Sequence, residues 1–530
     1  MKTLYYNAHV HPMTDAETEF SCLLVNGDRI EYIGNCAPKG KYRKVDLGGK
    51  HVFPAMTDCH LHLLYSIVLA AGSFQLCEII DGRVFPDSID KIGQRITAYC
   101  QNKTADGIIT GNSYIISAID EKRLPTRHEL DLWSENRAVI IYSIDGHSSA
   151  MSTALMEMLH INTNGHTGIF SGEAHEFIQG KVTDLIASKV TPTMLAKGIA
   201  NFSNICADFG IARVCAMDGN EDVKNDVLTS LLIFIAKRMD IGVRLFPQYI
   251  SLERATKLKK HLLRLRAGGC GAWELDGSVG SRSAAFNVPY LDGTQGHCYY
   301  SDDLIIEKVQ QALSAGMQLS THAIGETAIE QIVNAYSLNS RLIPTSGAMP
   351  RIDHFEFPSQ SAVDAIKKLR LALTVQPGFS WVDKRYLKSY EHFLPVNIIN
   401  QQLPLKELEN AGVCLCGSSD SPVQSVSPFE QMLGMVDFYI PGQSLTNYQA
   451  LKSYTINPAR MLGEDSRFGT LEAGKLADFF VCTEDILHCP AQSLPALKSE
   501  LTVIGGKAYQ RKNGSMLELL KLFFKFPHKI

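Results

Sequence analysis

The sequence is short of the features that mark membrane, secreted and nucleic-acid-binding proteins. Its longest apolar stretches, around 61–71 and 231–236, are too short to span a bilayer. Asn7, His9 and His11 interrupt the apolar character of the first residues, so we expect no signal peptide. A net charge of −4, a pI near 6.5 and the lack of a basic run leave no electrostatic footprint for a nucleic acid. We therefore expect no membrane and no nucleic-acid partner.

Thirteen cysteines are present, yet no two of them form a C-x-x-C pair. Several lie inside apolar runs, including Cys206, Cys215, Cys414 and Cys416. We interpret these thiols as reduced core residues of a cytoplasmic protein, because a reducing compartment keeps such cysteines unpaired. Cys59 lies beside two histidines, but the alternation of a strand would turn it to the opposite face, so we expect a structural role.

Both ends of the chain are predicted to be rich in β-strand. In the first segment, residues 1–55, two apolar runs flank Asn26-Gly27, which is a strong hairpin signal. A similar segment, residues 461–510, follows the long middle region. We predict one composite β-sandwich domain built from both segments, with two unrelated β-rich appendages as the alternative.

The middle region, residues 56–460, alternates predicted helices with short predicted strands. One helix begins at the capping pair Thr191-Pro192 and ends at Gly210, and a strand follows it. Alternation of this kind predicts an α/β fold with a parallel sheet. With 530 residues, 45% of them hydrophobic, the chain can hold a barrel of about 250 residues as one unit. Residues 72–200 show no clear pattern.

His60 and His62 are the residues around which the functional prediction is built. They follow a predicted strand at residues 51–56, and in an extended segment residues two apart point to the same face. Both imidazoles can therefore reach one metal ion. The alternative is a pair of partly exposed histidines at the end of a strand.

Three later predicted strands also end in ligand-type residues, namely His322, His354 and Asp420. The carboxyl ends of the strands of a (β/α)₈ barrel meet at one mouth, so this order predicts a metal site there. Imidazole and carboxylate ligands suit zinc and similar divalent ions. Asp420 could take a proton from water and pass it to a leaving amine; its alternative role is to cap the backbone before Pro422.

A series of longer motifs occurs in one order: Leu124-Pro-Thr-Arg127, Asp145-Gly-His-Ser148, Asp276-Gly-Ser-Val-Gly-Ser-Arg282, Pro289-Tyr290, His322-Ala-Ile-Gly325, Arg351-Ile-Asp-His354, Gln376-Pro377, Gly417-Ser-Ser-Asp420, Pro422-Val423 and Thr455-Ile-Asn-Pro-Ala459. In this order and over roughly residues 1–510, the chain resembles the YtcJ-like amidohydrolases, a group of the amidohydrolase superfamily that includes N-substituted formamide deformylases. Many ordered motifs are more specific than any one of them.

The resemblance implies a metal-dependent (β/α)₈ barrel hydrolase with a composite β-sandwich. It also implies a set of metal ligands: His60, His62, His322, His354 and Asp420. Asp420 would in addition be the catalytic acid and base. His147 and Arg282 match motif positions suited to substrate binding. The alternative for His147 is a loop histidine satisfied by its neighbours, and the alternative for Arg282 is a surface ion pair.

The sequence departs from the family pattern in three places. Glu326 stands where relatives usually carry Asp, and Ser421 replaces the usual Trp, which would widen or wet the substrate pocket. Ala272 occupies the position of a lysine that could have supplied a carboxylated bridge between two ions. Two ions need such a shared anionic group because dications repel strongly in a protein interior.

We predict that Glu173 replaces this bridge as a metal ligand. The alternative for Glu173 is an ordinary first-turn glutamate that favours the helix dipole. Glu274 is the other candidate, but it could instead pair with Arg282.

Together these observations predict a hydrolase that cleaves the C–N bond of a small N-acyl or N-substituted amide with one or two divalent ions, zinc first. A hydrolytic deaminase or cyclic amidase of the same superfamily, and a metal-binding member without turnover, are the alternatives. The apolar tail, residues 511–530, is predicted to dock on its own barrel or on a second copy in a homo-oligomer. A membrane-surface role for the tail is the weaker alternative.

Overall fold

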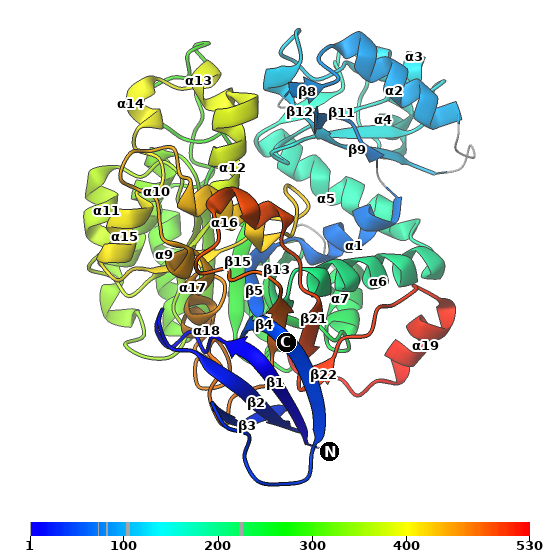
Figure 1. The fold of residues 1–530 in the computed structure, drawn as a ribbon. Helices are drawn as coiled ribbons and strands as arrows, with labels where there is room; N and C mark the ends of the chain where they lie inside the picture. The colour runs from blue at the N-terminus through cyan, green and yellow to red at the C-terminus, as the bar shows by residue number, and fades with distance from the viewer. Residues whose placement is uncertain (1, 73, 81–82, 102–106, 222–225) are drawn as a thin grey trace.

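A computed structural model describes residues 2–72, 74–80, 83–101, 107–221 and 226–530 (Figure 1). The two ends of the chain share one sheet at the bottom of this view, in the strand order β22-β21-β20-β4-β1-β2-β3. Its strands are β1 (Thr3–Val10), β2 (Phe20–Asn26), β3 (Arg29–Gly34), β4 (Arg43–Pro54), β20 (Phe479–Cys482), β21 (Leu501–Ile504) and β22 (Lys507–Ala508). The predicted hairpin is confirmed, since β2 and β3 pair antiparallel around Gly27.

The strand predicted at residues 51–56 is wrong in its bounds. Residues up to Pro54 belong to β4, where Pro54 pairs with Phe479 of β20. A new strand, β5 (Met56–Leu61), begins after Ala55 and contains His60. An apolar run can hide such a boundary, because the chain is buried on both sides of Ala55 and the backbone passes from one sheet to the next.

The middle of the chain contributes eight parallel strands to two sheets of the described structure. The first sheet has the order β14-β13-β5 and the second runs from β15 to β19 in sequence order. Their bounds are β13 (Ile211–Asp218), β14 (Gly242–Pro247), β15 (Arg266–Glu274), β16 (Gln318–Ala323), β17 (Arg351–His354), β18 (Ala372–Val375) and β19 (Cys414–Gly417). β14 lies against β15, and a parallel bridge joins Leu61, at the end of β5, to Ser421 after β19. The predicted parallel α/β arrangement is confirmed.

Helices separate these strands along the chain and cover them: α1 (Leu63–Gly72), α6 (Pro192–Asp208), α7 (Val227–Ala236), α8 (Leu252–Lys257), α9 (Asp302–Ser314), α10 (Glu326–Leu338), α11 (Gln360–Ile366), α12 (Pro377–Val382), α15 (Leu405–Asn410), α16 (Pro428–Val436), α17 (Asn447–Lys452) and α18 (Ile456–Leu462). The predicted start of α6 is confirmed: the Thr191 side chain accepts a hydrogen bond from the Met194 N–H, and Pro192 occupies the first turn. Phe202 and Cys206 of this helix are buried in the core it shares with β5 and β13.

The region without a clear sequence pattern folds into a separate lobe, seen at the upper right of Figure 1. Its five-stranded sheet consists of β6 (Phe74–Gln75), β9 (Ile109–Tyr114), β10 (Val139–Ser143), β11 (Ser148–Met151) and β12 (Ile169–Ser171). A hairpin and helices accompany it: β7 (Glu78–Ile80), β8 (Arg83–Phe85), α2 (Ile89–Gln101), α3 (Arg127–Trp133) and α4 (Thr153–Met158). Ile92, Leu130 and Ile141 belong to the lobe's own apolar core, and α5 (Glu173–Ser188) leads back toward α6.

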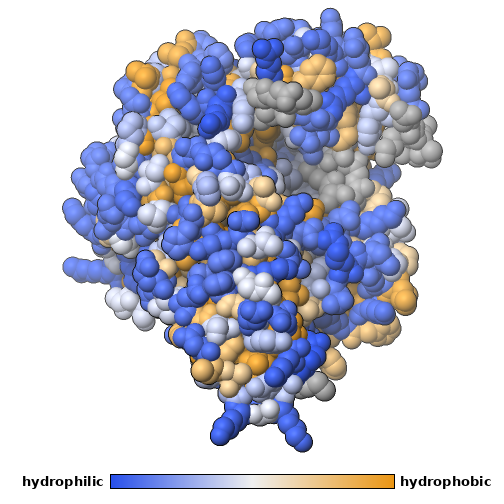
Figure 2. All heavy atoms as spheres, in the orientation of Figure 1, coloured by the Kyte–Doolittle hydropathy of each residue, from blue (hydrophilic) through white to orange (hydrophobic). Residues whose placement is uncertain are grey.

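The apolar tail forms α19 (Met516–Phe524) and docks on its own chain, which is the first of the two docking places predicted for it. Leu519 and Leu522 are buried, and the Phe523 ring lies 4.8 Å from that of Phe234 in α7. The last residue, Ile530, is also buried. Hydrophobic side chains remain exposed over α19 at the right of Figure 2. In the part of the chain described, no helix has the length and hydrophobicity to cross a bilayer.

Candidate metal centre

His60 and His62 are each oriented by an acceptor behind the ring. Nδ1 of His60 lies 2.8 Å from Oδ2 of Asp353, and Nδ1 of His62 lies 3.0 Å from the carbonyl oxygen of Met217. A carboxylate and a carbonyl only accept, so both Nδ1 atoms carry a proton, which leaves Nε2 of each ring as the atom that a metal ion can bind. This is the arrangement in which histidines bind metal ions.

Both Nε2 atoms face Asp420. Its Oδ1 lies 3.3 Å from Nε2 of His60 and 3.4 Å from Nε2 of His62. Asp420 has a φ of 55°, and its N–H donates to the His60 carbonyl, 2.9 Å away, which fixes this unusual backbone. Burial alone would lower the pKa of His60, but the carboxylates of Asp420 and Asp353 outweigh burial and raise it to about 10. The two carboxylates therefore favour a positive charge at Nε2 of His60, which either a proton or a bound metal ion can supply.

His322 and His354 complete the cluster from the neighbouring strands β16 and β17. Their ring centroids are 4.3 Å apart, and the His354 ring lies 5.2 Å from that of His60. Burial lowers the pKa of His354 to about 4 and that of His322 well below its ordinary range, so both rings are neutral. Asp276, which accepts from the backbone N–H groups of Ile324 and Gly325, fixes the chain just after His322.

The donor set fits a cation. His354 is 1% exposed, and neither of its ring nitrogens has a hydrogen-bond partner among the described residues. A buried polar group without a partner costs about 1–3 kcal/mol. A divalent ion would satisfy this ring together with the carboxylate of Asp420, and imidazole with carboxylate is a donor set of zinc and related ions.

His147 reaches the cluster from the lobe, where it lies in the turn between β10 and β11. Its Nδ1 is 3.3 Å from Oε1 of Glu274, and its ring is 5.4 Å from that of His322. Asp145, two residues earlier, accepts hydrogen bonds from Ser278 and Ser281 after β15. These bonds hold the turn of the lobe against the strand ends.

Arg282, one of the predicted site residues, does not join this cluster. It forms an ion pair of 3.3 Å with Asp292 and lies over the Phe393 ring, so its surface ion-pair alternative describes it better. The carboxylate of Glu274, the predicted partner of Arg282, lies beside His147 instead. The backbone of Glu173 begins α5, but its side chain lies outside the described part of the structure.

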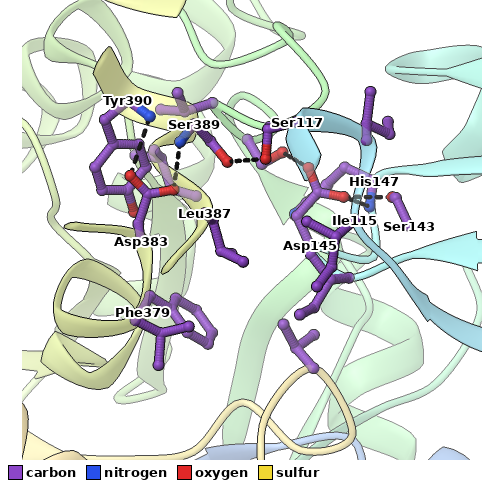
Figure 3. Close-up of a pocket in the computed structure, with 18 of the residues that line it drawn as sticks. Ile115, Ser117, Ser143, Asp145, His147, Phe379, Asp383, Leu387, Ser389 and Tyr390 are labelled. Carbon is purple, nitrogen blue, oxygen red and sulfur yellow. Dashed lines mark hydrogen bonds between the residues drawn. The ribbon is translucent and has the colours of Figure 1, made fainter. Parts of the chain in front are cut away.

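A pocket of about 100 Å³ lies over the cluster between the lobe and the strand ends. Figure 3 shows Ile115, Ser117, Asp145 and His147 on the lobe side, facing Phe379, Asp383, Leu387 and Tyr390 across the pocket. His354 and Asp420 belong to its lining, which is otherwise mostly apolar. A second, larger cavity reaches His62 and Asp420 from another side. No lysine or arginine occurs among the described residues that line either cavity.

The space-filling view shows the same face hollowed between the lobe and the part that carries α12, α13 (Ser389–Phe393) and α14 (Val396–Ile399) (Figure 2). The hydroxyls of Ser117 and Ser389 are 2.7 Å apart and connect the two sides of the pocket. The lobe therefore helps to shelter the cluster from solvent.

Sequence reasoning missed Cys270. Its Sγ lies 3.7 Å from Nε2 of His60 and 3.5 Å from Nδ1 of His322. The only local signal is the run of glycines around it, Gly268, Gly269 and Gly271, which marks an irregular strand.

Comparison with known proteins gives a consistent result. A family described as "Amidohydrolase family" matches residues 43–509. YtcJ of Bacillus subtilis (strain 168), described as an amidohydrolase, is 23% identical over 97% of this chain and 100% of its own. The N-substituted formamide deformylase of Arthrobacter pascens is 23% identical over 96% of this chain and 98% of its own.

Solved structures show the same fold. An uncharacterized metal-dependent hydrolase from Pyrococcus furiosus has a TM-score of 0.68 at 23% identity, over 92% of this chain and 100% of that chain. Another, from Pyrococcus horikoshii OT3, has a TM-score of 0.69 at 21% identity, over 93% and 99%. These neighbours support a TIM-barrel-like α/β fold.

Proposed function

Because the chain belongs to the amidohydrolase family and is thus a metal-dependent hydrolase of carbon–nitrogen bonds, we propose that it cleaves a small, uncharged amide with an apolar N-substituent. The observation that carries this proposal is that Asp420 and His354 line a largely apolar pocket. Asp145, Glu356 and Asp383 also line this pocket, and no described lysine or arginine balances them. A substrate carboxylate would be desolvated there without a lysine or arginine to pair with.

We infer further that the eight parallel strands close into one (β/α)₈ barrel. The bridge from Leu61 to Ser421 and the approach of β14 to β15 support this closure at both sheet edges. The seven-stranded sheet shared by both chain ends supports the proposed composite domain. In such a barrel the ligand residues lie at the carboxyl ends of the strands.

The residues that would hold the metal are His60, His62, His322, His354 and Asp420. The ion that fits them best is zinc. A bound ion of this kind lowers the pKa of water and polarises a carbonyl oxygen.

The protein's own groups would then move the proton and position the amide. Surrounding histidines outweigh burial and hold the pKa of Asp420 well below its usual range, so its carboxylate is available as a base. We propose that it accepts the proton of the attacking water and passes it to the leaving amine nitrogen. His147, held against Glu274, would position the substrate carbonyl.

A matched substrate pair tests the proposed substrate class. N-phenethylformamide and N-formylphenylalanine differ only by the carboxylate that the pocket should reject. The zinc-loaded protein should hydrolyse the uncharged compound with a kcat/KM at least about tenfold higher. A preference for the acid would contradict the proposed substrate class, and release of ammonia from aminated rings alone would favour the deaminase alternative.

A further inference from the structure

Cys270 lies in a bulge of β15. This strand pairs with β16 through Gly269 and Thr321, and the next pair is Glu274 with His322, so residues 270–273 lie outside the register. Gly269 and Gly271 flank the cysteine with φ values of 92° and 71°. Bulges beside active sites commonly re-aim one side chain, and here the bulge turns the Cys270 side chain toward the histidines.

The structure has little tolerance for a side chain at Gly268 or Gly269. A Cβ at Gly269 would lie 2.8 Å from Sδ of Met217, and one at Gly268 would lie 1.9 Å from the Ser320 carbonyl oxygen. Both distances are too short for real contacts, so only glycine allows the chain to follow this path. The position of Cys270 is therefore fixed by the strands around it.

The Cys270 thiol lies between two histidines of the cluster, His60 and His322. One neighbour is Nε2 of His60, which also faces Asp420, and the other is Nδ1 of His322. Ligand atoms of His60, Cys270 and His354 all lie within 4.8 Å of one another. This is close enough for one ion to contact all three after small side-chain movements.

An independent observation comes from His354, whose two buried ring nitrogens lack a hydrogen-bond partner in the described structure. Thiolate sulfur and imidazole nitrogen together form a common donor set for zinc. A thiolate ligand also carries a negative charge, which offsets the positive charge of a divalent ion in a buried site.

We propose that Cys270 is a thiolate ligand of the divalent ion, beside His60 and His354. This inference rests on the proposed function, because it assumes the same metal centre. When the sulfur–metal bond forms, the S–H bond breaks, its proton leaves to solvent and the sulfur donates the electron pair, so nothing is oxidised. Ala272, at the position where a lysine could have supplied a metal ligand, has no ligand atom in its side chain. The bulge brings the side chain of Cys270 to the site instead.

Cobalt(II) substitution tests this assignment without an activity measurement. Thiolate ligation gives cobalt an intense near-ultraviolet charge-transfer absorption. The wild-type protein and a Cys298→Ser control should show it, whereas Cys270→Ser should lose it and bind the ion at least about tenfold more weakly. Cys298 is partly buried and lines neither cavity.

The outcomes separate the two proposals. Full cobalt loading without this absorption in the wild type, or unchanged absorption in Cys270→Ser, would overturn the role of Cys270 alone. A wild-type protein that binds no divalent ion would overturn the proposed metal centre as well. If the serine variant fails to fold, iodoacetamide labelling of the wild-type protein tests the proposal instead. Zinc should slow the labelling of Cys270 at least about tenfold but leave the labelling of the exposed Cys36 unchanged. Equal labelling of Cys270 with and without zinc would overturn the proposal.

Discussion

His60 and Asp353 come from strands far apart in the sequence, yet Nδ1 of the histidine donates a hydrogen bond of 2.8 Å to the carboxylate. Nε of Arg351 lies 2.9 Å from the other oxygen of the same carboxylate. Burial alone would raise the pKa of Asp353, but Arg351 and His60 outweigh burial and hold it well below its usual range. The ring of His60 is thus held by a permanent anion.

Asp353→Asn should therefore weaken divalent-ion binding by about 10–100-fold, the range for groups that orient metal ligands. It should also lower the unfolding free energy by about 3–5 kcal/mol, because Arg351 loses its buried partner. Chelator competition measures the first effect and thermal unfolding the second. Asp292→Asn, which breaks the more exposed ion pair with Arg282, is the control and should change neither.

The double variant His60→Ala/His62→Ala should lose bound metal, because it removes two of the proposed ligands. Elemental analysis of the purified protein measures this directly. The matched control is His128→Ala/His392→Ala, since both of these histidines are exposed. Full metal content in the first variant would rule out the assignment of His60 and His62.

Asp420→Asn should leave the fold intact and reduce kcat by about 10²-fold or more, because the side-chain amide of asparagine cannot accept the proton of the attacking water. The measurement needs saturating metal, since Asp420 is also a proposed ligand. Circular dichroism and metal content verify that the variant is folded and loaded. A near-normal rate in that state would place the base elsewhere.

Stability at low pH should depend on Glu464, which binds Arg244 through contacts of 2.6 and 2.7 Å. Burial opposes the charge, but Arg244 outweighs it and lowers the pKa of Glu464 from 4.5 to about 2. A lowered pKa stabilises the fold above pH 4.5, by about 3 kcal/mol at most, and this contribution is lost as the pH falls toward 2. Melting temperatures across this range should fall more steeply for the wild type than for Glu464→Gln. Parallel curves would contradict this link.

The docked tail should contribute to stability through its buried face. Leu519→Ala and Leu522→Ala should each lower the unfolding free energy by about 2–5 kcal/mol, as buried leucines do. Removing residues 513–530 should uncover an apolar surface and promote self-association, measurable by light scattering. Phe526→Ala is the control because this ring is 93% exposed. A truncated protein with unchanged solubility and oligomeric state would argue against a structural role.

The sequence by itself determined the alternation of strands and helices, the sheet-rich ends and the ligand-type residues near the strand ends. These features follow from local rules: a period of two places His60 and His62 on one side of the chain, and caps such as Thr191 start helices whatever the partner. Ordered motifs then indicated the family. None of these signals depends on which strands become neighbours.

Only the tertiary structure decided what lies between the histidines. The bulge that presents Cys270 depends on the register of β15 against β16, and a register belongs to two strands and not to one. His147 meets Glu274 because a lobe with its own core docks on the strand ends, and the local sequence of the lobe carried no sign of that contact. Glu274 could pair with either Arg282 or His147 as far as its neighbours in sequence are concerned. Long-range packing places Glu274 beside His147, because it fixes distances between residues that the local sequence leaves undetermined.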